Sequence, residues 1–216
     1  MRDFPIFDTE FGVSSLVLKE IPYKKQAYIR IRAVQEEFFG EHLRECVSFC
    51  RMVGAERIFA AGDARLAQYP HYTAVLEMRG TAWVDHGKEK SLFPVTEATV
   101  SQWRNIYNES MACVDNAGTL ESRDEKRIVE SSGAYFVHDN GTLMGIGWLE
   151  DNKLLAIASV KKGAGEQVMH TLMSVMEGET MVLEVASTNV RAIRLYERLG
   201  FVTTQEIANW YDVTGC

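Results

Sequence analysis

The segment from Met181 to Phe201 constrains the fold of this chain more than any other part of it. It begins as an apolar strand, continues through a helix and ends where a second strand begins. Asn189 is a favourable N-cap for this helix and Gly200 a favourable C-cap. The helix carries an apolar stripe at spacings of three and four, made of Ala192, Leu195, Tyr196 and Leu199. The pattern predicts a helix packed against a sheet between two of its strands.

Two side chains in this segment are not explained by packing alone. Tyr196 lies inside the apolar stripe, where its hydroxyl needs a hydrogen-bonding partner if it is buried. Glu184 lies inside an apolar strand, and carboxylates are uncommon in buried positions. A strand–helix–strand unit that serves packing alone therefore does not account for either residue. A structural role remains an alternative for each: Tyr196 as a core residue, and Glu184 on the solvent side of an alternating strand.

The elements before this segment predict an α/β (α+β mixed) fold. Asp139-Asn-Gly and Asp151-Asn-Lys are turn signals between strand-like runs, and Asn-Gly accepts the positive φ of a tight hairpin. The second half is expected to run as strand 92–95, helix 96 to about 111, a partly helical stretch 115–130, strands 134–138, 143–150 and 154–160, helix 165–177, strand 181–186, helix 189–199 and two closing strands. Helices flanking a mixed sheet are the packing solution for this order.

The first half predicts a smaller α/β arrangement. Its strands are expected near 15–21, 27–34, 57–61 and 72–78, with a helix over 36–53. The polar run 85–91 marks the boundary, which gives domains 1–88 and 89–216. In each half a strand leads to a Gly-Glu pair, a helix and another strand, with 18 and 17 residues from the glycine to the strand. Two explanations remain open: a decayed duplication, or two unrelated units of similar length.

The stretch from Val160 to Glu166 is a candidate phosphate site. Gly163 and Gly165 let the backbone turn sharply and approach a ligand. The N-terminus of the helix that follows favours an anion, and Lys161 and Lys162 add positive charge. An ordinary turn is the alternative. The chain lacks both the Gly-Lys-Ser/Thr ending of a P-loop and the Gly-x-Gly-x-x-Gly dinucleotide fingerprint.

Charge and cysteine content restrict the partners. Lys plus Arg total 23 and Asp plus Glu total 30, a net charge of −7, which argues against general nucleic-acid binding. No apolar run approaches the ~18 residues of a membrane helix and no secretory signal is recognised, so a cytoplasmic protein is expected.

His42, Cys46 and Cys50 share one helix face beside apolar neighbours, which predicts core packing rather than a metal site. His138 and His170 are expected at the surface or in turns.

The segment 183–201 resembles the signature of the GNAT superfamily of acetyl-CoA-dependent N-acetyltransferases. The pattern Asn-x-x-Ala-x-x-Leu-Tyr-x-x-x-Gly-Phe is complete at Asn189, Ala192, Leu195, Tyr196, Gly200 and Phe201. The resemblance covers about 92–213 and implies a mostly antiparallel, GNAT-like sheet flanked by helices. The first half, 1–88, resembles the family only as a degenerate copy.

The resemblance also implies a cofactor, acetyl-CoA, and a role for each matching residue. The glycine turn would hold the coenzyme A pyrophosphate, the strand before it would pair with the pantetheine amides, and Asn189 would contact the cofactor. The implied cofactor-binding residues are Ala158, Ser159, Val160, Lys161, Lys162, Gly163, Ala164, Gly165, Glu166 and Asn189. Tyr196 would protonate the departing thiolate. Glu184 is placed like the general base of bacterial enzymes that acetylate the N-terminal amines of ribosomal proteins.

One departure from the family pattern stands beside these implied roles. Val160 occupies the position where the family usually has Arg or Gln, three residues before the first glycine of the turn. The lysines at 161 and 162 are expected to compensate for the missing positive charge. The departure bears on coenzyme A affinity rather than on the fold.

These observations predict an N-acetyltransferase that acts on a primary amine of a small molecule or peptide. Only the neutral amine attacks, so a general base is required. A backbone N–H on the strand that ends at Val160 is the expected donor to the carbonyl oxygen. Two alternatives remain: a non-catalytic acyl-CoA-binding or regulatory module, and a nucleotide-binding protein that uses the Gly163 turn. The identity of the acceptor depends on loops such as 112–133.

Overall fold

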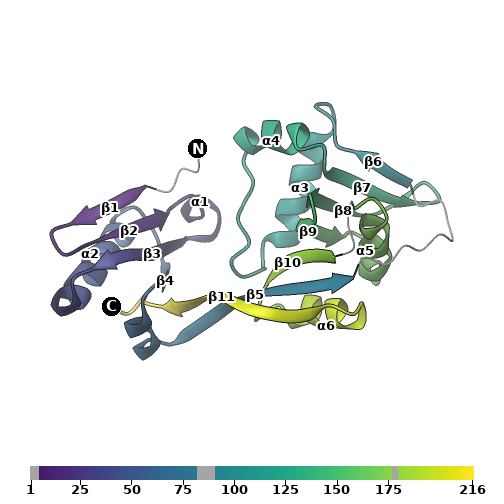
Figure 1. Ribbon diagram of the computed structural model, residues 1–216. Helices are drawn as coiled ribbons and strands as arrows, with labels where there is room; N and C mark the ends of the chain where they lie inside the picture. The colour runs from purple at the N-terminus through teal and green to yellow at the C-terminus, as the bar shows by residue number, and fades with distance from the viewer. Residues whose placement is uncertain (1–4, 82–90, 177–179) are drawn as a thin grey trace. The chain divides into compact units, whose positions relative to one another are not determined.

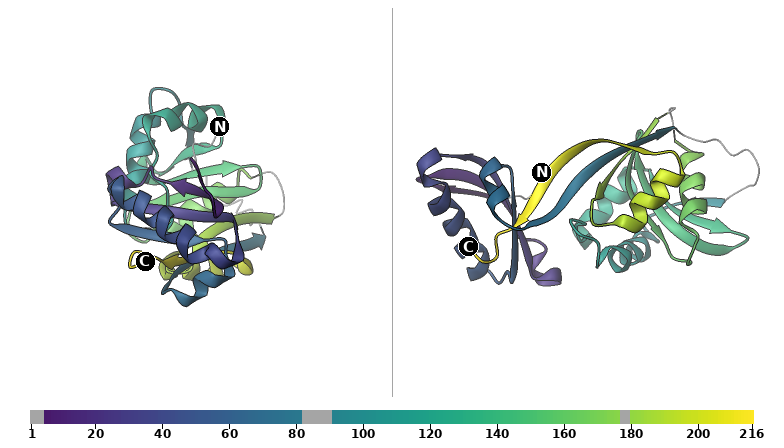
Figure 2. Two further views of the ribbon diagram at one scale, coloured as in Figure 1. Left: turned by 90° about the vertical axis from the view of Figure 1, so that its left-hand side faces the viewer. Right: turned by 90° about the horizontal axis from the view of Figure 1, so that it is seen from below.

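The computed structural model describes residues 5–81, 91–176 and 180–216, which form two compact units (Figure 1). The first unit comprises Met1–Ala74 and Ile207–Cys216, and the second comprises Val75–Glu206. Strands β5 (His71–Thr81) and β11 (Val202–Asp212) each contribute to both units (Figure 2). The expected domain boundary at 88/89 falls within 82–90, outside the described residues.

The first unit is a small sheet with one long helix against it. Its strands follow the order β1-β2-β3-β4-β11, and β3 and β4 are parallel. The helix α2 connects these two strands, and its apolar side chains pack into one core with them. The elements are β1 (Ile6–Thr9), β2 (Gly12–Val17), α1 (Ile21–Lys24), β3 (Gln26–Val34), α2 (Phe39–Met52), β4 (Arg57–Ala61) and the 3₁₀ helices Glu36–Phe38 and Ala64–Gln68.

His42, Cys46 and Cys50 lie in this core, as the sequence predicts. The Nδ1 atom of His42 is 2.8 Å from the hydroxyl of Thr9, and its Nε2 atom is 2.8 Å from the hydroxyl of Ser14. Burial lowers the pKa of His42 and raises the pKa of Cys46 to about 11 and that of Cys50 to about 12. Within residues 5–81, 91–176 and 180–216, no group of three or more His, Cys, Asp or Glu side chains is arranged to hold a metal ion.

The second unit is a larger sheet with helices on both faces. Its strands follow the order β11-β5-β10-β9-β8-β7-β6. Strands β6 to β9 pair antiparallel in succession, β10 pairs antiparallel with β5, and β10 pairs parallel with β9. The elements are β6 (Ser91–Pro94), α3 (Val100–Met111), the 3₁₀ helix Ser122–Asp124, α4 (Glu125–Glu130), β7 (Ala134–Asp139), β8 (Thr142–Glu150), β9 (Lys153–Ser159), α5 (Gly165–Met173), β10 (Thr180–Ala186) and α6 (Val190–Arg198).

The two faces of this sheet bury separate cores. Helices α3 and α4 pack on one face around Trp103 and Ile128, and α5 and α6 pack on the other around Leu172 and Tyr196 (Figure 1). The predicted fold class, a mostly antiparallel mixed sheet flanked by helices, is confirmed. The Asn140-Gly141 hairpin is confirmed as well, because both residues have positive φ between paired β7 and β8.

Some predicted elements differ from the structure. The strand expected near 15–21 runs over Gly12–Val17, and Ile21 begins the short helix α1 instead. The sequence predicts two closing strands, whereas the chain forms one long strand, β11. Neither glycine nor proline interrupts residues 202–212, so nothing in the local sequence breaks this strand. The predicted helix 165–177 also ends earlier, at Met173, and residue 177 lies outside the described residues.

Two glycines of β8 allow α5 to approach the sheet closely. A Cβ atom on Gly145 would lie 2.3 Å from the carbonyl oxygen of Ala158 and 2.8 Å from a methyl group of Val168. A Cβ atom on Gly147 would lie 2.3 Å from a methyl group of Leu172. The Gly-Ile-Gly run is therefore a packing feature of the sheet.

Replacing Gly145 with alanine is expected to destabilise the protein. The added methyl group meets backbone, which cannot rotate away, and overpacking of this kind costs about 1–3 kcal/mol. Gly40→Ala is the control, because no atom lies within 4 Å of that position in α2, and alanine there stabilises a helix by about 0.5–1 kcal/mol. Urea unfolding of both variants measures the difference. Equal stabilities would contradict the packing argument.

Candidate active site

A pocket of about 1180 Å³ opens in the second unit where β9 and β10 separate. Among the described residues, the parallel ladder between them covers only Lys153–Leu154 against Val182–Leu183. Beyond it the pocket is lined by residues 154–160 of β9 and the turn after it on one side, and by residues 183–186 of β10 on the other. In the first unit, by contrast, β3 and β4 stay paired over residues 26–30 and 57–61. This parallel pair leaves no such opening along the residues that it covers.

The edge of β9 that faces this opening carries unpaired backbone groups. Val160 donates its N–H to the carbonyl of Met144, so Ser159 and Gly145 form a non-hydrogen-bonded pair. In an antiparallel ladder, the N–H and C=O of such a residue point away from the partner strand. Ser159, and by alternation Ile157, therefore present both groups to the pocket. The N–H of Val160 is engaged with β8.

The turn after β9 brings the start of α5 to the pocket. Gly163 has a φ of +86°, a conformation that favours glycine, and no atom lies within 4 Å of where its Cβ would be. The helix starts without a side-chain cap at Ala164, so its first N–H groups remain available for a ligand. The pocket lining includes Lys162, Gly163, Gly165 and Glu166.

Lys161 and Ala164 are outside this lining. Ala164 is instead buried in the core beneath α5. Neither residue therefore supplies a side chain to the pocket wall.

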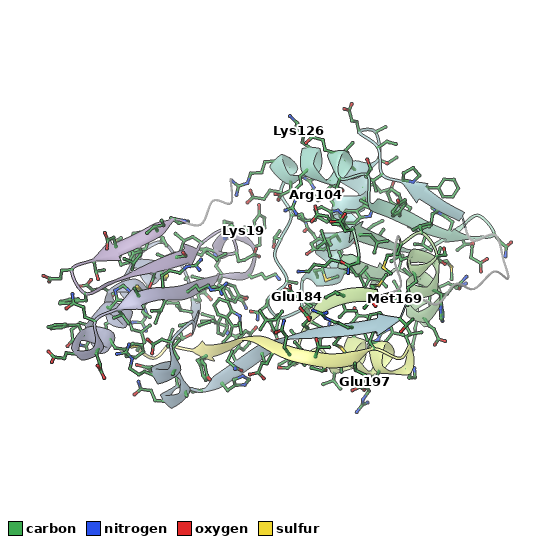
Figure 3. All side chains as sticks on the ribbon, in the orientation of Figure 1. Lys19, Arg104, Lys126, Met169, Glu184 and Glu197 are labelled. Carbon is green, nitrogen blue, oxygen red and sulfur yellow. The ribbon has the colours of Figure 1, made fainter. Side chains whose placement is uncertain are left out.

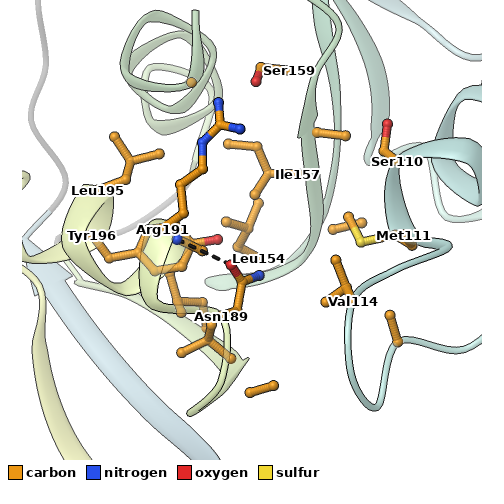
Figure 4. A pocket seen from close by; sticks show the side chains of 18 of the residues that line it. Ser110, Met111, Val114, Leu154, Ile157, Ser159, Asn189, Arg191, Leu195 and Tyr196 are labelled. Carbon is orange, nitrogen blue, oxygen red and sulfur yellow. Dashed lines mark hydrogen bonds between the residues drawn. The ribbon is translucent and has the colours of Figure 1, made fainter. Parts of the chain in front are cut away.

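Helix α6 places Asn189 and Tyr196 on the same wall of the pocket (Figure 4). Asn189 caps the helix, because its Oδ1 atom accepts the N–H of Ala192 at 3.2 Å. Tyr196 is 6% exposed, and burial raises its pKa to about 12. Within the described part of the chain its hydroxyl makes no hydrogen bond. Tyr196 is therefore a buried, protonated donor that lines the pocket and has no partner among the described residues.

Glu184 also lines the pocket, but in a different environment. Its carboxylate forms an ion pair with Lys153, and the side chains of Glu184 and Lys153 are each 42% exposed. It lies opposite Glu77 in the β10–β5 ladder. Glu184 thus has a charged partner and access to water rather than apolar surroundings.

Three arginines of α6 belong to the pocket and were not predicted from the sequence. Arg191, Arg194 and Arg198 all line it, and their spacing of three and four places them on one side of the helix. Arg191 extends from α6 along the pocket towards the side where Ser159 lies (Figure 4). The spacing of three and four residues that predicts the apolar stripe of α6 also predicts a basic stripe made of these arginines. His138 and His170 do not line the pocket.

The family comparison agrees with this architecture. Residues 100–201 match the model of the acetyltransferase (GNAT) family, and this part of the chain is a GNAT domain. GNAT membership supports acyl transfer as the general activity. No curated protein matches the sequence. No helix in the described residues is long and apolar enough to cross a membrane.

Solved structures show the same fold at low sequence identity. A GCN5-related N-acetyltransferase from Sphaerobacter thermophilus has a TM-score of 0.56 at 11% identity, covering 93% of this chain and 76% of its own. A putative acetyltransferase from Pyrococcus horikoshii has a TM-score of 0.58 at 12% identity, covering 94% and 69%. A conserved protein of unknown function from Staphylococcus epidermidis has a TM-score of 0.57 at 10% identity, covering 98% and 94%.

Proposed function

We propose that this chain transfers an acetyl group from acetyl-CoA to a primary amine of a small molecule or peptide. One observation carries the proposal. The opening between β9 and β10 brings an unpaired strand edge, a helix N-terminus and the unpartnered hydroxyl of Tyr196 into a single pocket. A strand edge that pairs with the cofactor, an anion site and a proton donor are three of the elements that this transfer requires, beside the general base.

The residues present fit the cofactor. Ile157 and Ser159 offer N–H and C=O groups that suit the amides of pantetheine. The Gly163–Gly165 turn and the first N–H groups of α5 suit a pyrophosphate, with Lys162 and Arg191 beside them. A Cβ atom on Gly165 would make a tight contact with Leu195 at 3.1 Å, so glycine suits the close approach of α5 and α6 here. Arg191 supplies the positive charge that is missing at Val160.

The chemistry then follows from the positions of the side chains. Acetyl-CoA, when bound, supplies a thioester carbonyl that an amine attacks. We assign Glu184 to take the proton that the amine loses and Tyr196 to give one to the sulfur, so that the protons balance. The pKa of Tyr196, about 12, keeps its hydroxyl protonated at neutral pH. Of the N–H groups of Ile157 and Ser159, the one that pantetheine leaves free is the candidate donor to the carbonyl oxygen.

Thiol release tests this function directly. Acetyl-CoA is incubated with simple amines, aminoglycosides or peptides with free N-termini, and the released thiol is measured. Release that depends on an amine supports the enzyme. Coenzyme A binding without release with any acceptor would favour the second candidate, a non-catalytic acyl-CoA-binding module, which is suggested by Val160 at the position where the family carries Arg or Gln. ATP binding without coenzyme A binding would contradict both.

Arg191→Gln is expected to weaken coenzyme A binding at least tenfold, which is about 1.4 kcal/mol. The substitution removes a guanidinium beside the helix N-terminus, where charge-assisted hydrogen bonds to phosphate are strong. Calorimetry is done with coenzyme A and with pantetheine, which has no pyrophosphate. The comparison shows whether Arg191 acts on the pyrophosphate. Pantetheine affinity is expected to remain unchanged.

The matched control is Lys126→Gln, which removes one positive charge from α4 outside the pocket (Figure 3). It is expected to bind coenzyme A like the parent. Unchanged coenzyme A affinity in folded Arg191→Gln would show that other groups hold the phosphates.

A further inference from the structure

An amine of the chain itself contacts the carboxylate that we assign as general base. The Nζ atom of Lys153, at the start of β9, donates a hydrogen bond to the carboxylate of Glu184 on β10. Glu184 lines the pocket, and in the proposed function it takes the proton that the attacking amine loses. An attacking amine has to lie within hydrogen-bond reach of its base. The nitrogen of Lys153 meets this requirement.

The order of groups in the cofactor directs its sulfur towards this nitrogen. Coenzyme A carries its pyrophosphate, pantetheine and sulfur in that sequence. When the pyrophosphate is at the Gly163–Gly165 turn and pantetheine runs along Ser159 and Ile157, the sulfur is directed towards Leu154, where β9 meets β10. Lys153 is the next residue of β9, within the short ladder that joins the two strands.

Lys153 and Glu184 also share one face of the sheet. Lys153 is paired with Val182, and Glu184 follows two residues later, so alternation directs both side chains to the same face. Leu183, which lies between them on β10, belongs to the core on the other face, together with Tyr196. The amine and the proton donor to the sulfur therefore approach the thioester from opposite faces, and neither displaces the other.

A second carboxylate lies next to Lys153 and is used differently. Glu150 is opposite Lys153 in the β8–β9 ladder, but its carboxylate pairs with Arg127 at 3.7 Å. Lys153 extends instead to Glu184, and the side chains of this pair are each 42% exposed. Exposed ion pairs are weak and the four-carbon stem of lysine is flexible, so the nitrogen is free to move from the carboxylate to the thioester.

We propose that Lys153 is a self-acetylation site, to which the active site of the same chain transfers an acetyl group. This inference rests on the proposed acetyltransferase function and adds a modification site to it. Nζ loses one proton to Glu184 and forms a C–N bond with the thioester carbon, and the C–S bond breaks. Of the two protons that Nζ gives up in all, the sulfur receives one through Tyr196 and water takes the other. The product is a neutral amide, which ends the ion pair with Glu184.

Peptide mass spectrometry tests this inference on the full chain. A lysine deacetylase first removes acetyl groups acquired during expression. The protein is then incubated with acetyl-CoA that carries an isotopically labelled acetyl group, without any acceptor, and labelling is followed with time. Lys153 is expected to be labelled at least tenfold faster than Lys126, because a general base typically contributes ~10²–10⁴-fold. Lys126 is the matched reference, since it pairs with a carboxylate, Glu130, on α4 outside the pocket (Figure 3).

Three variants connect the label to the site. Glu184→Gln is expected to slow the labelling of Lys153 at least tenfold and to leave that of Lys126 unchanged. Glu150→Gln removes the other neighbouring carboxylate and is expected to change neither rate. Lys153→Arg keeps the positive charge beside Glu184 and is expected to abolish the single thiol per chain that the parent releases without an acceptor.

The concentration dependence shows which molecule supplies the active site. Transfer within one chain predicts a rate constant that does not change when the protein is diluted tenfold. A rate constant that falls in proportion to the protein concentration would mean transfer between molecules and would overturn the inference.

The remaining outcomes separate the two proposals. Labelling of Lys153 no faster than that of Lys126, or undiminished in Glu184→Gln, would overturn self-acetylation, and thiol release with added amines would leave the acetyltransferase standing. Neither labelling of Lys153 nor thiol release with any amine would overturn both.

Discussion

Tyr196→Phe is expected to lower turnover by ~10² or more while leaving acetyl-CoA affinity within a few-fold. The ring packs against Phe201, with their centroids 5.9 Å apart, and phenylalanine keeps that contact. Only the hydroxyl is lost, and it makes no hydrogen bond with the described residues that its removal would break. A loss confined to kcat, with KM unchanged, therefore reports on the proton donated to the sulfur.

A packing control accompanies this experiment. Phe201→Leu alters the same apolar contact from the other side and leaves the Tyr196 hydroxyl in place. It is expected to lower stability in urea with a much smaller effect on turnover. If Tyr196→Phe instead turns over like the parent, Tyr196 is a core residue here and the proton reaches the sulfur from solvent.

Glu184→Gln is expected to lower turnover by ~10² at neutral pH. Glutamine keeps the size of the side chain, but it accepts no proton from the amine. Turnover is measured with one acceptor at one pH, because the amine of the acceptor itself titrates.

Glu150→Gln is the comparison for this variant, since Glu150 is an exposed carboxylate at the end of β8, outside the pocket. It is expected to keep the parental turnover. Turnover that persists in Glu184→Gln would mean that the base lies elsewhere or that solvent takes the proton of the amine. That result would leave the assignment of Tyr196 intact.

Local patterns predicted most of the fold of the second unit. The Asn140-Gly141 turn, the capped helix after Asn189 and the glycine turn at 163–165 are each determined by the conformations that these residues allow. The end of the chain was less predictable. Residues 202–212 form one strand rather than two, because pairing with distant strands sets its length and no local signal does.

The candidate site was predictable where it depends on local geometry and unpredictable where it depends on tertiary structure. The positions of Tyr196 and Asn189 on α6 were predictable because the helix pattern carries them, whereas their proposed roles come from the family resemblance. The environment of Glu184 was not predictable, because its partner Lys153 is 31 residues away and meets it only across the β9–β10 ladder.

The first unit includes the last residues of the chain, so this unit can be completed only at the end of translation. Strand β11 pairs with β4 through Tyr211 and Ala60, and the fully buried Val213 donates its N–H to the carbonyl of Ile58. Domains generally fold as units during translation, from the N-terminus onwards. Here the N-terminal unit lacks its last strand and part of its core until residues 207–216 have left the ribosome. The unit that is translated first is therefore the last to be completed, and a nascent chain paused after Glu206 exposes the edge of β4.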